Sequence, residues 1–246
     1  MEIQTDEGTE NKGVDCMIHE NLMKVRERVE EACKRAGRDI SEVTLIAVSK
    51  TKPVEDVRAA MADGVVDFGE NKVQEIMDKC EAIPEPLNWH MIGHLQRNKV
   101  KYIVDKVCLI HSVDSLRLAK QIEEEACKKD VVCPVLIEVN VAGEDTKFGV
   151  SVEETESLIR EISKFPHVKV KGLMTIAPNV DNPEDNRIHF RALKNLLVDI
   201  KRKNIDNVDM SILSMGMTGD YEVAIEEGAT MVRVGTGIFG MRNYNI

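Results

Sequence analysis

The chain has 246 residues, of which 43% are hydrophobic but only 4% aromatic, and its formal net charge at pH 7 is -10. This length suits one large domain or two small ones with an aliphatic core, and the acidity argues against nucleic-acid binding, which requires a basic surface. No apolar run is long enough to predict a membrane span. Six cysteines without a Cys-x-x-Cys pair predict reduced thiols in a cytoplasmic protein.

The N-terminal region divides into a polar segment and a helix. Residues 1–16 are acidic and lack the basic start and apolar stretch of a signal peptide, so we interpret them as a disordered tail. From Ile18 to Ala32 apolar residues recur every three or four positions, which predicts an amphipathic helix that Gly37 ends. We assign residues 17–246 to one domain.

Eight short segments with strand patterns, the first of them rich in β-branched residues, alternate with helical patterns along this domain. The predicted strands are residues 43–50, 65–69, 88–93, 108–113, 134–140, 168–175, 210–215 and 231–239. A helix follows Pro53, and others are predicted at 115–129, 152–164, 183–203 and 219–227, with 96–104 the weakest pattern. This alternation indicates parallel strands, and eight regular units favour a single α/β domain, a (β/α)8 barrel, over an open doubly wound sheet.

Several polar or glycine-bearing positions fall at predicted strand ends, where barrels of this type carry their chemistry. They are Lys50 as the last residue of the first strand, Asn71, His94 and Lys147 after the second, third and fifth, Met174 at the end of the sixth, Ser214 to Asp220 after the seventh, and Gly235 with Thr236 in the eighth. We therefore expect these residues at one mouth of the barrel.

The last two strands carry a predicted phosphate cradle. Thr218 is placed to cap the following helix, while Gly235 allows close backbone approach and Thr236 adds a hydroxyl group. Residues 235–240 also spell a dinucleotide fingerprint, but too little chain follows them for the helix and strand that the fingerprint requires.

Two cations stand out on the strands. Arg233 alternates with Val232 and Val234, so it should point into the barrel and need an acidic partner or a ligand. Lys50 is predicted to end the first strand, where an apolar mouth near other cations favours the neutral amine that attacks aldehydes. Lys52 is predicted to lie solvated in the loop.

His90 and His94 have the spacing of two metal ligands on a helix, but here they lie in or beside a strand and no third ligand is evident. We predict no metal site.

Six motifs resemble those of the pyridoxal phosphate homeostasis protein family, a cofactor-binding barrel related to the N-terminal domain of alanine racemase. They are AVSKTKP (47–53), FGEN (68–71), WHMIGHLQ (89–96), GLMTI (172–176), SMGM (214–217) and MVRVGT (231–236). The likeness covers nearly the whole chain, from about residue 17 to 244.

The resemblance implies pyridoxal 5'-phosphate (PLP) held as a Schiff base on Lys50. It further implies phosphate contacts from Ser214, Thr218, Gly235 and Thr236, the Arg233 guanidinium against the pyridine nitrogen, and a pocket lined by Asn71 and Met174. Members of the family bind PLP without established turnover and are thought to buffer it or deliver it to PLP-dependent apoenzymes. A monomer is the default expectation.

The chain departs from the family pattern at Lys72 and Phe148, both expected at the pocket rim. Two other functions stay open: a PLP-dependent racemase or decarboxylase, and a barrel that binds a different phosphorylated metabolite. A racemase needs acid–base groups on both faces of the cofactor, and the tyrosines at 102, 221 and 244 have no evident route to the second face.

Overall fold

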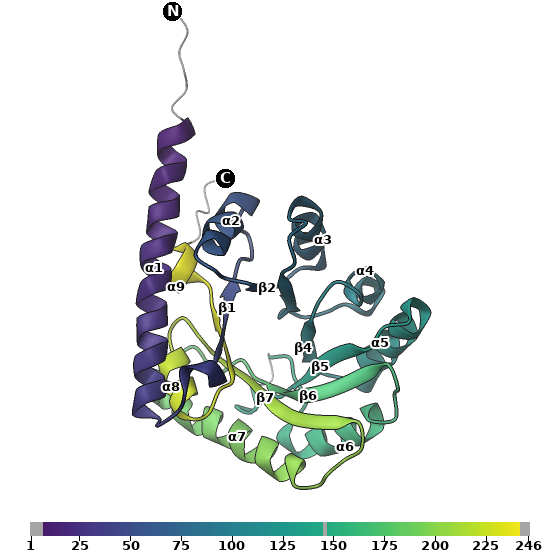
Figure 1. Ribbon diagram of the computed structural model, residues 1–246. Coiled ribbons are helices and arrows are strands. Elements are labelled where there is room, and N and C mark those ends of the chain that lie inside the picture. The colour runs from purple at the N-terminus through teal and green to yellow at the C-terminus, as the bar shows by residue number, and fades with distance from the viewer. Residues whose placement is uncertain (1–6, 145–146, 242–246) are drawn as a thin grey trace, which may run out of the picture.

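Eight parallel strands close into a barrel in the order in which they occur along the chain, as the computed structural model shows for residues 7–144 and 147–241 (Figure 1). This confirms the predicted (β/α)8 barrel. The strands are β1 Thr44–Val48, β2 Asp67–Glu70, β3 Asn88–Met91, β4 Leu109–Val113, β5 Cys133–Glu138, β6 Val168–Met174, β7 Val208–Met217 and β8 Met231–Val234.

The helices surround the strands, and the short 3-10 helices are labelled η. They are α1 Glu7–Arg35, η1 Ile40–Glu42, α2 Val54–Ala62, α3 Val73–Ala82, η2 Arg97–Lys99, α4 Val100–Ile103, α5 Leu116–Lys129, α6 Val152–Ile162, η3 Pro183–Asn186, α7 Arg187–Lys201, α8 Tyr221–Glu226 and α9 Thr236–Phe239. Serine caps begin two of the longer ones, since Ser115 accepts a hydrogen bond from the N–H of Leu118 and Ser151 accepts one from Glu154.

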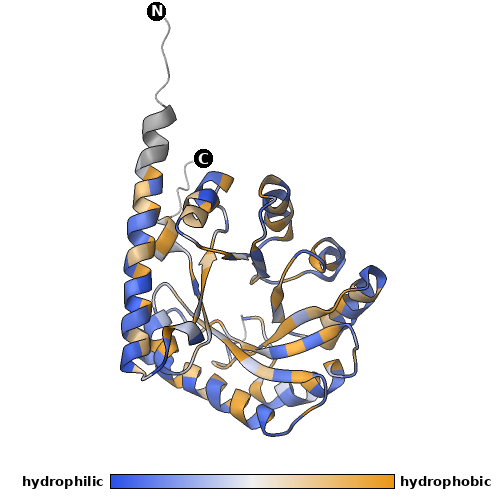
Figure 2. Ribbon diagram, in the orientation of Figure 1, coloured by the Kyte–Doolittle hydropathy of each residue, from blue (hydrophilic) through white to orange (hydrophobic). Residues whose placement is uncertain are grey.

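The hydrophobic core has two parts, which follow from the alternation of side chains along a strand. Outside the barrel, strand residues such as Ile137 and Val232 pack against the apolar faces of the helices (Figure 2). Inside it, Leu109, Leu136 and Met174 form a small separate cluster. Burying one aliphatic side chain of this size contributes about 1.5–3 kcal/mol, so the larger outer cluster supplies most of the stability.

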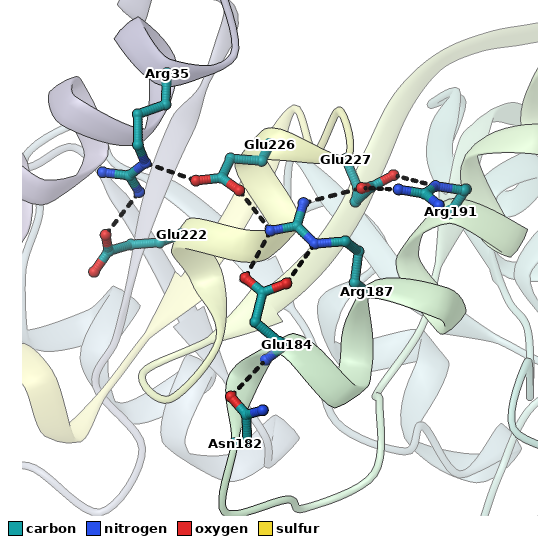
Figure 3. Close-up of polar contacts among 8 residues, drawn as sticks. All are labelled: Arg35, Asn182, Glu184, Arg187, Arg191, Glu222, Glu226 and Glu227. Atoms are coloured by element: carbon teal, nitrogen blue, oxygen red, sulfur yellow. Dashed lines mark hydrogen bonds and ion pairs between the residues drawn. The ribbon is translucent and has the colours of Figure 1, made fainter.

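An ion-pair network anchors α8, the helix that follows the predicted phosphate loop (Figure 3). Arg35 of α1 donates hydrogen bonds to Glu226 (2.7 Å) and Glu222 (2.9 Å), and Arg187 of α7 donates to Glu226 (2.6 Å) and Glu227 (3.0 Å). Arg187 also pairs with η3. The long helix α1 therefore runs beside α8 and α9, on the side of the barrel where the first and last strands meet (Figure 1).

Several predicted boundaries were wrong by two residues or more, and three of them bear on the site or the tail. Residues 7–16, which we assigned to the disordered tail, form the first turns of α1; their polar residues interrupt the apolar pattern but are compatible with helix. Strand β1 ends at Val48, two residues before Lys50. Strand β8 ends at Val234, because residues 236–239, predicted as strand, form the short helix α9. Residues 1–6 of the predicted tail, and Tyr244, lie outside the described residues.

In the described part of the chain, no helix combines the length and apolarity needed to cross a membrane. All six cysteines are free thiols, as predicted.

Candidate functional site

Lys50 lies in a tight turn directly after β1. The ladder continues to the N–H of Ser49, which donates to the carbonyl of Gly69 (3.1 Å), and the N–H of Lys52 then donates back to Ser49 (3.0 Å). Thr51 takes a left-handed backbone (φ 63°), and its N–H donates to Glu75 (2.6 Å). The backbone around the half-buried Lys50 is therefore held from both sides.

A buried ion pair lies under this turn. Lys79 of α3 donates hydrogen bonds to the Glu70 carboxylate (2.5 Å) and to the carbonyl of Ser49 (2.7 Å), and the Ser49 hydroxyl donates to the same carboxylate oxygen (2.6 Å). Burial raises the pKa of Glu70, and the neighbouring Lys79 ammonium opposes that rise. Sequence reasoning missed this pair; its one available signal was a glutamate on a buried strand nine residues before a lysine.

We predicted that Lys52 lies solvated in a loop, and this prediction was wrong. Its side chain is half-buried and donates a hydrogen bond of 2.6 Å to the carbonyl of Phe239, the last residue of α9. A cation at the C-terminal end of a helix is a favourable arrangement. The loop that carries Lys50 is thus attached to the loop after β8.

The residues of the predicted phosphate cradle lie where the loops after β7 and β8 meet. The Thr218 hydroxyl oxygen accepts a hydrogen bond from the N–H of Gly237 (3.3 Å) in the first turn of α9. We predicted that Thr218 caps α8, and this prediction was wrong. Asp220 occupies the capping position, and its carboxylate closes the turn by accepting a hydrogen bond from the N–H of Met217 (2.7 Å).

Backbone donors in this cradle fit an anion. The hydrogen bonds of the described residues include none from the N–H groups of Thr218, Gly219 or Thr236. Two hydroxyl groups, of half-buried Thr218 and exposed Thr236, lie on the same two loops. N–H and O–H donors without a protein acceptor suit a phosphate group.

Close packing accounts for the glycines. A Cβ atom at Gly235 would lie 3.3 Å from the carbonyl oxygen of Val48, and one at Gly237 would lie 2.9 Å from Val234 and 3.2 Å from the Thr218 methyl group. A cavity of about 240 Å³ opens beside Gly219 and is lined by Lys147, Ile176 and Met217, among others, but its lining includes neither Lys50 nor Arg233.

Arg233 points into the barrel, as predicted, and is 4% exposed. It donates hydrogen bonds to the Ser214 hydroxyl (2.5 Å) and to the carbonyl of Thr175 (2.8 Å). Burial lowers its pKa to about 10, while Glu138 and Asp220 act in the opposite direction. The pKa of Glu138, on β5, is raised to about 7 because burial and Asp114 disfavour its charge more than Arg233 favours it.

The other predicted site residues lie around this interior. Ser214 is fully buried on β7, and its hydroxyl contacts Arg233 and His111 (3.0 Å), so it has partners inside the barrel. Met174 is also fully buried, at the end of β6. The backbone of half-buried Asn71 packs against Gly93, where a Cβ atom would lie 2.6 Å from the Asn71 carbonyl oxygen.

The rim residues differ in their surroundings. Phe148 is exposed and stacks on His94 with ring centroids 4.1 Å apart, so it joins the loops after β5 and β3. Lys72 is exposed at the start of α3. His90 is buried on β3, well below the rim, and no cluster of metal-ligating side chains occurs among residues the structure describes.

Comparisons with known proteins agree with this geometry. Residues 21–243 match the family model of the alanine racemase N-terminal domain. The chain is 50% identical over 226 residues to the pyridoxal phosphate homeostasis protein of Aquifex aeolicus (strain VF5), covering 92% of this chain and 98% of that protein. A structure of an unknown protein from Bifidobacterium adolescentis has a TM-score of 0.88 at 33% identity and covers 97% of this chain and 98% of that one. PipY of Synechococcus elongatus PCC7942, solved with PLP bound, has a TM-score of 0.76 at 32% identity, covering 88% and 100%.

Proposed function

The chain belongs to the pyridoxal phosphate homeostasis protein family, built on the alanine racemase N-terminal fold, and we propose on this basis that it binds PLP and keeps it available to PLP-dependent apoenzymes. The observation that carries the proposal is that three features meet at one mouth. They are the turn that carries Lys50, the loops joined by the Thr218–Gly237 hydrogen bond, and the buried Arg233. Strands β1 and β8 pair directly, with Ala47 opposite Val234, so these features are neighbours.

Each end of PLP has a matching group in this arrangement. We propose that the Lys50 amine forms the Schiff base with the aldehyde, since the turn after β1 holds it at the mouth. Thr218, Gly235 and Thr236 would hold the phosphate through N–H and O–H donors, as the packing of the two loops supports. Asn71 and Met174 would border the pocket.

Arg233 would face the pyridine nitrogen. PLP supplies an aldehyde for covalent attachment and a pyridine ring that can accept electrons. A cation against the ring nitrogen keeps that nitrogen unprotonated and makes the ring a weaker electron acceptor. Ser214 is held by Arg233 and His111, so we assign its hydroxyl to fixing Arg233; a phosphate contact from this residue stays a prediction.

We further propose that the protein acts as a carrier and not as an amino-acid enzyme. Its relatives are named homeostasis proteins. Of the two described tyrosines, Tyr102 is exposed on α4 and Tyr221 is buried on α8, so neither is placed as a second acid–base group across the mouth from Lys50. A monomer in the cytoplasm is the form that we expect to exchange PLP with other proteins.

The visible spectrum of the purified protein tests the proposal. After loading with PLP and removal of unbound PLP by gel filtration, wild type should remain yellow, and borohydride reduction should fix the label on Lys50. Lys50→Ala should stay colourless. Lys52→Met should still be labelled at Lys50, because in wild type the Lys52 amine donates to the Phe239 carbonyl and is not the amine that we expect to react. A wild type that stays colourless with PLP would overturn the proposal and favour a different phosphorylated ligand. Sustained conversion of L-alanine to D-alanine, abolished in Lys50→Ala, would overturn the carrier role.

A further inference from the structure

A row of polar side chains crosses the interior of the barrel below the proposed cofactor site. Consecutive members approach within hydrogen-bond distance: Asp67 Oδ1 to His90 Nε2 (3.1 Å), His90 Nδ1 to His111 Nε2 (3.0 Å), His111 Nδ1 to Ser214 Oγ (3.0 Å) and Arg233 to Ser214 Oγ (2.5 Å). The step from His111 to Ser214 joins β4 to β7, which are not neighbours in the barrel. The row thus connects the first residue of β2, at the opposite end of the barrel, to Arg233.

With both imidazoles neutral, the chemistry of the two end groups sets every proton in the row. Arg233 can only donate, so Ser214 accepts from it; the Asp67 carboxylate can only accept, so His90 donates through Nε2–H. A neutral imidazole has one donor and one acceptor, which leaves His90 Nδ1 to accept from His111 Nε2–H and His111 Nδ1 to accept from the Ser214 hydroxyl. All four hydrogen bonds then point the same way, from Arg233 to Asp67.

The surroundings keep His111 neutral. It is fully buried, and burial together with His90 and Arg233 lowers its pKa well below the usual value. His90 is 2% exposed. The Cys108 thiol lies 3.5 Å from His90 Nε2 but donates to the carbonyl of Trp89 (3.3 Å), so it leaves the assigned direction unchanged.

We propose that Asp67, His90 and His111 are positioning residues that orient Ser214 and, through it, the Arg233 guanidinium at the cofactor ring. Because the Ser214 proton is committed to His111, its oxygen presents only lone pairs to Arg233, and the second Arg233 hydrogen bond, to Thr175, fixes the plane of the guanidinium. This inference rests on the proposed binding of PLP. It adds that the properties of the bound cofactor depend on a carboxylate at the far end of the barrel.

The first experiment needs no cofactor. Nitrogen-15 NMR of the imidazoles in the wild-type protein should find both histidines as neutral Nε2–H tautomers at neutral pH. In Asp67→Ala, His90 should lose this fixed tautomer. A charged His111, or an Nδ1–H tautomer at either residue in wild type, would overturn the assigned direction whether or not PLP binds.

The second experiment uses the loaded protein. His111→Leu should weaken PLP binding about tenfold, the effect of one lost charge-linked hydrogen bond, and shift the visible band of bound PLP. His111→Asn, which keeps an acceptor near the Nδ1 position, should recover part of both. Asp67→Ala should shift the band in the same direction. Asn88→Ala is the matched control, since it removes only the bond from Asn88 to Asp67 (3.1 Å) and should leave the band unchanged.

The outcomes separate the two proposals. Failure of wild type to bind PLP would overturn the proposed function, while the tautomers measured without cofactor would still decide the hydrogen-bond row. Normal binding with identical spectra in wild type, His111→Leu and Asp67→Ala would overturn the positioning role alone.

Discussion

Lys79 and Glu70 form a buried ion pair directly beneath the turn that carries Lys50, with the Lys79 ammonium 2.5 Å from the Glu70 carboxylate and both side chains almost fully buried. The second carboxylate oxygen of Glu70 is buried without a hydrogen-bond partner. The Glu70 charge depends on the Lys79 cation, although the Ser49 hydroxyl also donates to it, since removing one member of a buried ion pair leaves the charge of the other uncompensated.

We expect Lys79→Met to lower the free energy of unfolding by about 3–5 kcal/mol, because it leaves the Glu70 carboxylate buried without its cation. Adding Glu70→Gln to this variant should recover part of the loss. Urea denaturation measures both. The control Lys164→Met removes an exposed ion pair with Glu161 and should change stability by less than about 0.5 kcal/mol. An equally small change in Lys79→Met would contradict the structural role of the pair.

We expect Gly237→Ala to weaken PLP binding about ten- to a hundredfold. The new methyl group would lie 2.9 Å from Val234 and 3.2 Å from the Thr218 methyl group, so Thr218 must move away from the proposed phosphate position and lose a charge-assisted hydrogen bond. Titration with PLP at constant pH gives the dissociation constant. Gly13→Ala, where a Cβ atom meets nothing within 4 Å, is the matched control. Binding as tight as in wild type would place the phosphate elsewhere.

Glu138 makes stability depend on pH in a defined direction. Its pKa is raised from 4.5 to about 7 by burial, so between these pH values Glu138 binds more protons in the folded than in the unfolded state, and its contribution to stability falls as pH rises. Glu138→Gln has no titrating group at this position. We therefore expect the unfolding free energy of Glu138→Gln minus that of wild type to increase with pH across this window, by at most about 1.4 kcal/mol per pH unit.

Urea denaturation of both proteins from about pH 4.5 to about pH 8 measures this difference. His111, whose lowered pKa destabilises the folded state as pH falls below 6.5, is present in both proteins and largely cancels in the comparison. A difference that stays constant across the window would show that Glu138 keeps an ordinary pKa.

Much of the fold follows from local sequence. Short apolar segments predict all eight strands, their alternation with helices predicts parallel pairing, and eight regular units favour a closed barrel over an open sheet. The inward direction of Arg233 follows from its alternation with valines that face the helices. The position of Lys50 near the end of the first strand also follows, although the strand ends two residues before it. Boundaries were less predictable, since Thr236 to Phe239 read as strand but form α9.

The sequence by itself therefore determined the barrel, the mouth at which the motifs converge, and the inward direction of Arg233, because these depend on spacing along single elements. Only the tertiary structure decided the partners. Closure of the barrel brings β1 against β8, so Lys52 reaches Phe239, and it aligns His90 and His111 with Ser214 across the interior. Contacts between residues 21 to 187 positions apart leave no periodic signal in the chain, since they depend on which strands close the barrel and in which register.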